Sequence, residues 1–119
     1  GFTLIELLVV LAIVALMLTL ATPRYIRSLD ASKETALRET LRTTRETIDK
    51  FYADTGRYPE SLEELVEKKY LRALPFDPLV DSSTAWQLIA PQDGEAGVVF
   101  DVKSTARGAN RDGKPYAEM

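Results

Sequence analysis

The feature of this sequence that most limits its fold is an apolar run from Phe2 to Ala21, in which Glu6 is the only charged residue. A helix of that length is about 30 Å long, at about 1.5 Å per residue, and this matches the hydrocarbon core of a bilayer. A carboxylate within such a segment is costly, by roughly 2.5–3.5 kcal/mol at the bilayer centre, and usually has a partner. The run itself contains no cationic side chain, so the free amine of another chain is a candidate partner for Glu6.

The run also has two simpler interpretations, the second of which is favoured by position alone. A cleaved secretory signal is disfavoured because an acidic residue sits inside the apolar stretch and no clear small-residue cleavage site follows it. Alternatively, Glu6 lies near the start of the helix and reaches the lipid headgroups. Arg24 and Arg27 follow the span and would by the positive-inside tendency place its C-terminal side in the cytoplasm, so the orientation is not settled by charge.

Composition excludes several classes of function. The chain has 119 residues, a net charge of −3, and neither Cys nor His. Thiol nucleophiles, disulfides, the usual zinc sites and histidine general bases are therefore ruled out, and the charge balance offers no basic surface for nucleic acid. We expect no catalytic residue and no enzyme activity.

Helical periodicity resumes directly after Pro23, a residue that kinks or locally unwinds a helix. Apolar residues at three- and four-residue steps predict one buried stripe on a helix that reaches about Ala53, and this stripe consists of Leu37, Leu41, Ile48 and Phe51/Tyr52. Oppositely charged residues four apart predict ion pairs on the other faces of this helix: Glu34–Arg38, Arg42–Glu46, Arg45–Asp49 and Glu46–Lys50. Gly56 is the expected C-cap.

The remaining half of the chain, residues 57–119, reads as a short helix, a loop, two strands and a tail. Ser61 and Glu64 form a capping box ahead of a helix that reaches about Lys69, and an extended proline-containing loop follows over residues 70–78. Residues 85–90 and residues 97–103 are predicted to form two antiparallel strands. In the first strand, Trp86, Leu88 and Ala90 share one face. The tail from residue 104 onward is expected to be irregular and anchored by Tyr116.

The N-terminal heptapeptide Gly1-Phe2-Thr3-Leu4-Ile5-Glu6-Leu7 resembles the signature of type IV pilins and type II secretion pseudopilins. Residues 52–59 and 70–78 are similar to the stretches that end the long helix and form the following loop in major pseudopilins. We therefore favour a major pseudopilin of a type II secretion system.

This resemblance implies an α+β, pilin-like fold in which a long N-terminal transmembrane helix packs on a small antiparallel sheet. Residues 1–24 would form the transmembrane and assembly segment, and residues 25–119 the periplasmic domain. A prepilin peptidase would cleave after Gly1, which belongs to the leader, and the new amine of Phe2 would be methylated. Glu6 and Phe2 would then hold neighbouring subunits together, and Pro23 would mark a helix break.

The resemblance also implies a function and partners. The subunit would leave the bacterial inner membrane, as a single-pass protein, and polymerise into a periplasmic pseudopilus that drives folded proteins across the outer membrane. Its partners would be further copies of itself, minor pseudopilins, an inner-membrane assembly platform with its ATPase, the prepilin peptidase and the lipid bilayer.

Two other functions remain open from the sequence. The first is a type IVa pilin in a surface fibre for adhesion, motility or DNA uptake, although such pilins often carry a C-terminal disulfide that this chain lacks. The second is a monomeric, membrane-tethered sensor, which would leave Glu6 and the Phe2 junction unexplained.

Major pseudopilins bind a calcium ion near the C-terminus, and the resemblance suggests four candidate ligands here: Asp101, Ser104, Asn110 and Asp112. Calcium requires six to eight oxygen ligands. Four basic residues that would repel a cation are interspersed with them, namely Lys103, Arg107, Arg111 and Lys114. We therefore expect no cofactor, with calcium as the alternative.

Overall fold

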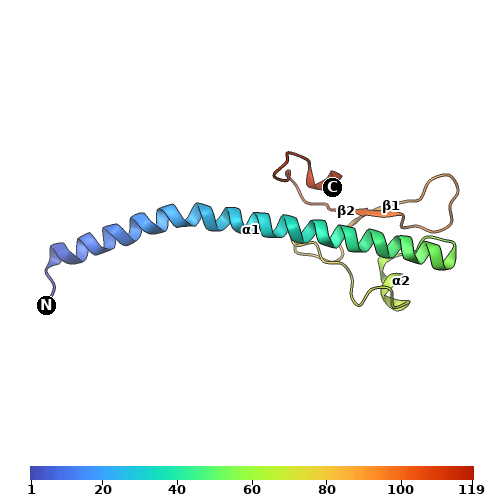
Figure 1. The fold of residues 1–119 in the computed structure, drawn as a ribbon, viewed down its shortest axis with the longest axis horizontal. Coiled ribbons are helices and arrows are strands. Elements are labelled where there is room, and N and C mark those ends of the chain that lie inside the picture. The colour runs from blue at the N-terminus through green and yellow to red at the C-terminus, as the bar shows by residue number, and fades with distance from the viewer. The chain divides into compact units, whose positions relative to one another are not determined.

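The computed structural model describes the backbone of residues 1–119 and the side chains of residues 1–25 and 29–119. In chain order the elements are α1 (Leu4–Thr55), α2 (Leu62–Glu67), β1 (Gln87–Ile89), β2 (Asp101–Lys103) and the 3-10 turn η1 (Tyr116–Glu118) (Figure 1). The chain divides into two compact units, Gly1–Ser32 and Lys33–Met119. The predicted α+β fold with a long N-terminal helix and a small antiparallel sheet is confirmed.

The first unit is helical from Leu4 onward and contains Pro23. Two hydroxyls near the proline, those of Thr19 and Thr22, donate to the main-chain oxygens of Ala15 and Leu18. α1 continues through Pro23 to Thr55, so the helix does not stop at the end of the apolar run. The predicted unwinding at Pro23 is not seen in the single chain and stays a prediction for the assembled state.

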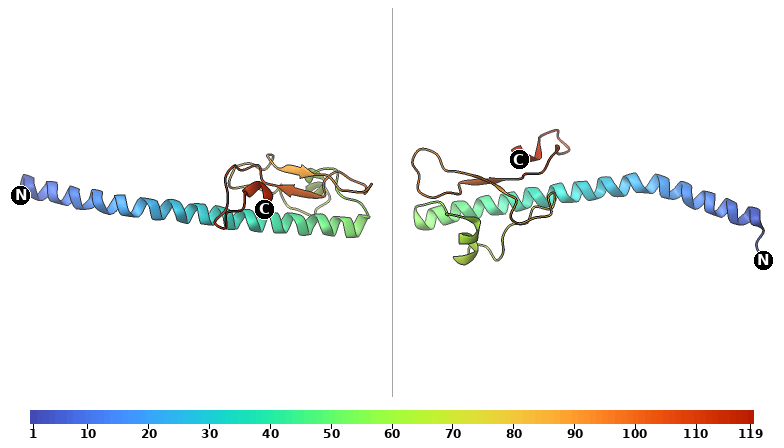
Figure 2. Two further views of the ribbon diagram at one scale, coloured as in Figure 1. Left: turned by 90° about the horizontal axis from the view of Figure 1, so that it is seen from above. Right: turned by 180° about the vertical axis from the view of Figure 1, so that it is seen from behind.

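In the second unit, the predicted stripe of α1 forms the core. Leu37, Leu41, Ile48 and Phe51 are all buried and pack with α2 residues, Trp86 and two valines from the region of β2. The strand pair and α2 lie against different sides of this part of α1 (Figure 1, Figure 2). Burial of this stripe, more than the intrinsic propensity of a threonine-rich segment, stabilises the helix.

The two strands pair antiparallel, as predicted, but they are shorter than expected. The structure places Leu88 opposite Val102. The second strand begins at Asp101 because residues 98 and 99 bond elsewhere: the N–H groups of Val98 and Val99 donate to the main-chain oxygen of Pro59. Of the residues expected on one face, Trp86 precedes the strand and is buried, while Leu88 within it is 45% exposed.

Trp86 ties the strand region to the loop that precedes it. Its indole Nε1–H donates to the main-chain oxygen of Pro75 at 2.8 Å. Nearby, Asp77 is buried, and its carboxylate accepts from the Ser104 hydroxyl and from the Leu79 N–H. The proline-containing loop is thus fixed at both its centre and its end.

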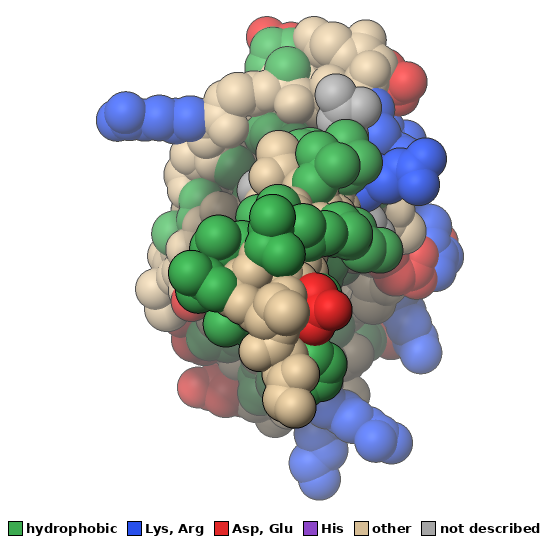
Figure 3. Space-filling view, turned by 90° about the vertical axis from the view of Figure 1, so that its left-hand side faces the viewer, with side chains coloured by type: hydrophobic (Ala, Val, Ile, Leu, Met, Phe, Trp, Pro, Cys, Tyr) green, Lys and Arg blue, Asp and Glu red, His purple; other side chains and the backbone are tan. Residues whose placement is uncertain are grey.

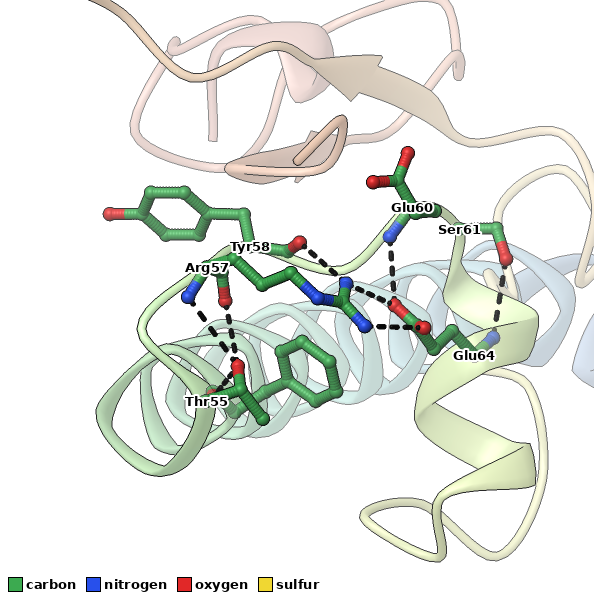
Figure 4. Close-up of polar contacts among 7 residues, drawn as sticks. Thr55, Arg57, Tyr58, Glu60, Ser61 and Glu64 are labelled. Atoms are coloured by element: carbon green, nitrogen blue, oxygen red, sulfur yellow. Dashed lines mark hydrogen bonds and ion pairs between the residues drawn. The ribbon is translucent and has the colours of Figure 1, made fainter. Parts of the chain in front are cut away.

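The α2 helix begins with the expected cap. Ser61 Oγ accepts from the Glu64 N–H at 3.2 Å, while the Glu64 carboxylate accepts from the N–H of Glu60 and not from that of Ser61 (Figure 4). The same carboxylate binds the Arg57 guanidinium, which lies over the Phe51 ring. The cap therefore also joins α2 to the turn that follows α1.

The ion pairs along α1 differ in part from those predicted. Glu34–Arg38 and Arg42–Glu46 form, at 3.0 and 2.8 Å. Glu34 is only 2% exposed, however, so it does not lie on a face apart from the buried stripe, as was predicted for these pairs. Arg45 pairs with Asp101 on β2 at 2.7 Å instead of with Asp49, because the helix–sheet contact brings that carboxylate close.

Candidate assembly site

Glu6 lies in the first turn of α1, where it exchanges two hydrogen bonds with Thr3. The Thr3 N–H donates to Glu6 Oε2, and the Glu6 N–H donates to Thr3 Oγ1, both at 3.2 Å. This capping box satisfies two donors that the start of a helix leaves unpaired, and it explains why α1 begins at Leu4. The sequence reasoning missed this role, although a Thr followed three residues later by Glu is its usual signal.

The surface around Glu6 is apolar and uncovered in the single chain. Phe2 is 92% exposed, and the large side chains between Leu4 and Leu20 are exposed as well (Figure 3). The apolar first part of α1 is not buried by the rest of the described chain. By length and composition this stretch can cross a membrane, and a soluble protein would rarely leave so large an apolar surface exposed.

Gly1 and Phe2 precede α1 and are exposed. The expected partner of Glu6 is the amine of Phe2 in a neighbouring, processed subunit. Processing at Gly1 and the Glu6–Phe2 contact stay predictions.

The first two calcium candidates are each bound to another side chain. Asp101 Oδ1 accepts from Arg45 Nε and from the Val102 N–H, both at 2.7 Å. Ser104 Oγ donates to the buried Asp77 carboxylate and accepts from the Ala106 N–H.

The other two candidates lie together in the turn near the C-terminus. Asn110 Oδ1 accepts from the N–H groups of Asp112 and Lys114, at 2.9 and 3.0 Å. Asp112 Oδ2 accepts from the Arg38 guanidinium at 3.1 Å. Across residues 1–25 and 29–119, no group of three or more Asp or Glu side chains is placed to hold a metal ion. The donor set therefore does not fit the calcium site suggested by the resemblance.

The N-terminal segment and the whole chain have known relatives. Residues 1–22 match the prokaryotic N-terminal methylation motif. Two relatives, both named type II secretion system core protein G, align with most of the chain. The one from Xanthomonas campestris pv. campestris is 26% identical over 125 residues, covering 98% of this chain and 84% of the relative. The one from Pseudomonas aeruginosa is 30% identical over 107 residues, covering 76% of this chain and 73% of the relative. The chain belongs to the type II secretion system core protein G family.

Core protein G is the major pseudopilin, so the family predicted from the heptapeptide and the two later stretches is confirmed. The methylation motif, at residues 1–22, coincides with the exposed apolar part of α1. No solved structure matches the chain.

Proposed function

We propose that this pseudopilin is a structural subunit that polymerises into a periplasmic pseudopilus and thereby drives type II secretion across the outer membrane. The observation that carries this proposal is the position of Glu6, a carboxylate at the start of an uncovered apolar helix inside the methylation motif. Membership in the core protein G family supports it. The proposal includes no catalytic step by the subunit itself.

In the proposed assembly, a prepilin peptidase cleaves after Gly1 and frees the amine of Phe2, which is then methylated. The Glu6 carboxylate of one subunit binds the Phe2 amine of its neighbour and neutralises two charges that would otherwise be isolated in an apolar environment. Because the capping box uses one Glu6 oxygen in the single chain, the carboxylate is held at the helix start before assembly.

The proposed path of the subunit has two stages. Residues 1–24 first anchor it in the inner membrane, with residues 25–119 in the periplasm. An assembly platform with its ATPase then adds subunits to a homo-oligomeric filament, together with minor pseudopilins. A local unwinding at Pro23 would let the two parts of α1 adjust in the filament.

The test uses Glu6→Gln in the full chain. Glutamine still accepts the Thr3 hydrogen bond but carries no charge, so the substitution keeps the cap and removes the pairing. We expect the variant to remain in the membrane fraction and to form few or no filaments, measured by shearing and immunoblotting. Glu39→Gln, which removes an exposed carboxylate from the second half of α1, is the matched control. Wild-type amounts of filaments from Glu6→Gln would contradict the proposed role of Glu6.

A further inference from the structure

The C-terminal turn of the chain is bound to α1 through one buried carboxylate. Glu34 is 2% exposed and accepts three hydrogen bonds or ion-pair contacts from two partners. Its Oε1 binds the Arg38 guanidinium at 3.0 Å, and its Oε2 accepts from the main-chain N–H of Arg111 and from Arg111 Nε, both at 3.3 Å. A carboxylate buried to this degree is stable only when it is paired in this way.

The turn is closed by its own contacts as well. The Asn110 N–H donates to the main-chain oxygen of Lys114, and the Asn110 main-chain oxygen accepts from the Gly113 N–H. The side-chain oxygen of Asn110 accepts two further N–H groups. Arg38 connects the two sets of contacts, because it binds Glu34 with the same nitrogen that binds Asp112. The result is an ion-pair clamp, formed by Glu34, Arg38, Arg111 and Asp112. Its two long-range contacts, Arg38–Asp112 and Glu34–Arg111, join residues 74 and 77 positions apart in the sequence.

The clamp occupies the region in which the family resemblance places calcium. A calcium ion there would have to displace Arg38 from Asp112 and Arg45 from Asp101, and it would sit beside two guanidinium groups. It would also take the Asn110 and Ser104 oxygens from the bonds that close their turns. Like charges at such short range disfavour binding.

We propose that in this pseudopilin the two guanidinium groups of the clamp replace the divalent cation, so the C-terminal turn is ordered without calcium. The inference concerns the turn itself and holds whether or not the subunit forms a filament. Glu34 acts as a positioning residue: it fixes the main chain at Arg111 and through Arg38 the side chain of Asp112. The Arg38–Asp112 contact is exposed and contributes little alone, so the buried Glu34 carries most of the effect.

Hydrogen exchange of the full chain in detergent, followed by mass spectrometry, tests the proposal. The amides of residues 110–116 should exchange at the same rate in chelator and in excess calcium chloride. Glu34→Gln should speed their exchange about tenfold, because it removes a charge-assisted contact from the turn. Glu39 is an exposed acid five residues further along the helix, and it pairs with Arg42. Glu39→Gln should leave the exchange rate unchanged.

If Glu34→Gln does not fold, Arg38→Gln tests the same contacts. The Arg38 side chain is half exposed, so its replacement disturbs the core less. We expect this variant to speed exchange of the same amides in chelator and in calcium alike. The proposal would be overturned if calcium slowed exchange of the wild-type turn and Asp112→Asn abolished that protection. It would also be overturned if neither Glu34→Gln nor Arg38→Gln changed the exchange rate.

Discussion

The Arg57 guanidinium and the Glu64 carboxylate face each other through two parallel N–H···O bonds, of 2.8 and 2.9 Å. The Arg57 hydrogen bonds and the bond from the Glu60 N–H hold the pKa of Glu64 down to about 2. This pair joins the turn after α1 to α2 (Figure 4).

The first prediction concerns acid stability. Because the pKa of Glu64 is lower in the folded state than its ordinary value of 4.5, its charge stabilises the fold above that value, and the stabilisation is lost as the pH falls toward 2. We expect Glu64→Gln to lower the melting temperature at neutral pH by about 5 °C. The difference between wild type and variant should shrink as the pH is lowered. A difference that stays constant down to pH 2 would show that the charge is not responsible.

The second prediction concerns Gly97, where φ is +108°. A Cβ at this position would overlap the Tyr58 carbonyl oxygen and lie 2.6 Å from the carbonyl carbon. We expect Gly97→Ala to destabilise the fold by about 3 kcal/mol in chemical denaturation, because strain and overlap add. Gly94→Ala is the control, since φ is +75° there but no atom lies within 4 Å of the added Cβ. Equal losses in the two variants would mean that only backbone strain matters.

The third prediction concerns the buried Asp77 carboxylate, which is 1% exposed. Ser104→Ala removes a donor from it without changing the shape of the site much. We expect a loss of about 2 kcal/mol in unfolding free energy, as for a buried acceptor left unsatisfied. Thr105→Ala removes an exposed hydroxyl that bonds to Ala85 and should cost less. The idea fails if the exposed change is the more damaging one.

The fourth prediction separates the two units. The fragment Lys33–Met119 should fold alone and stay monomeric at micromolar concentration, because its apolar stripe on α1 is already covered. Circular dichroism and sedimentation velocity check the two parts of this statement. Stable oligomers would place an assembly surface on the second unit, and its exposed apolar residues would then be the first to examine: Phe76, Leu88, Val98 and Phe100.

The elements that depend on local sequence were predictable. The stripe of α1, the Ser61 cap and the antiparallel order of the strands follow from periodicity and capping rules that act within a few residues. Three long-range contacts were not predictable from local rules. They are the Glu34–Arg111 contact of the ion-pair clamp, the Arg45–Asp101 pair and the Asp77–Ser104 bond, which join positions 77, 56 and 27 residues apart. The four-residue charge spacing predicted that Glu34 lies on a face other than the buried stripe. Local spacing carries no information about the C-terminal turn that covers Glu34.

The buried indole of Trp86 gives the second unit its own optical probe. It is the single tryptophan of the chain, and its N–H is bound to the Pro75 carbonyl inside the core. The tryptophan fluorescence of the protein therefore originates where the proline-containing loop meets the strand region. A shift of this emission toward longer wavelength reports that these two segments have separated. Loosening of this region can be followed by tryptophan emission, without an added label and at concentrations too low for filaments to form.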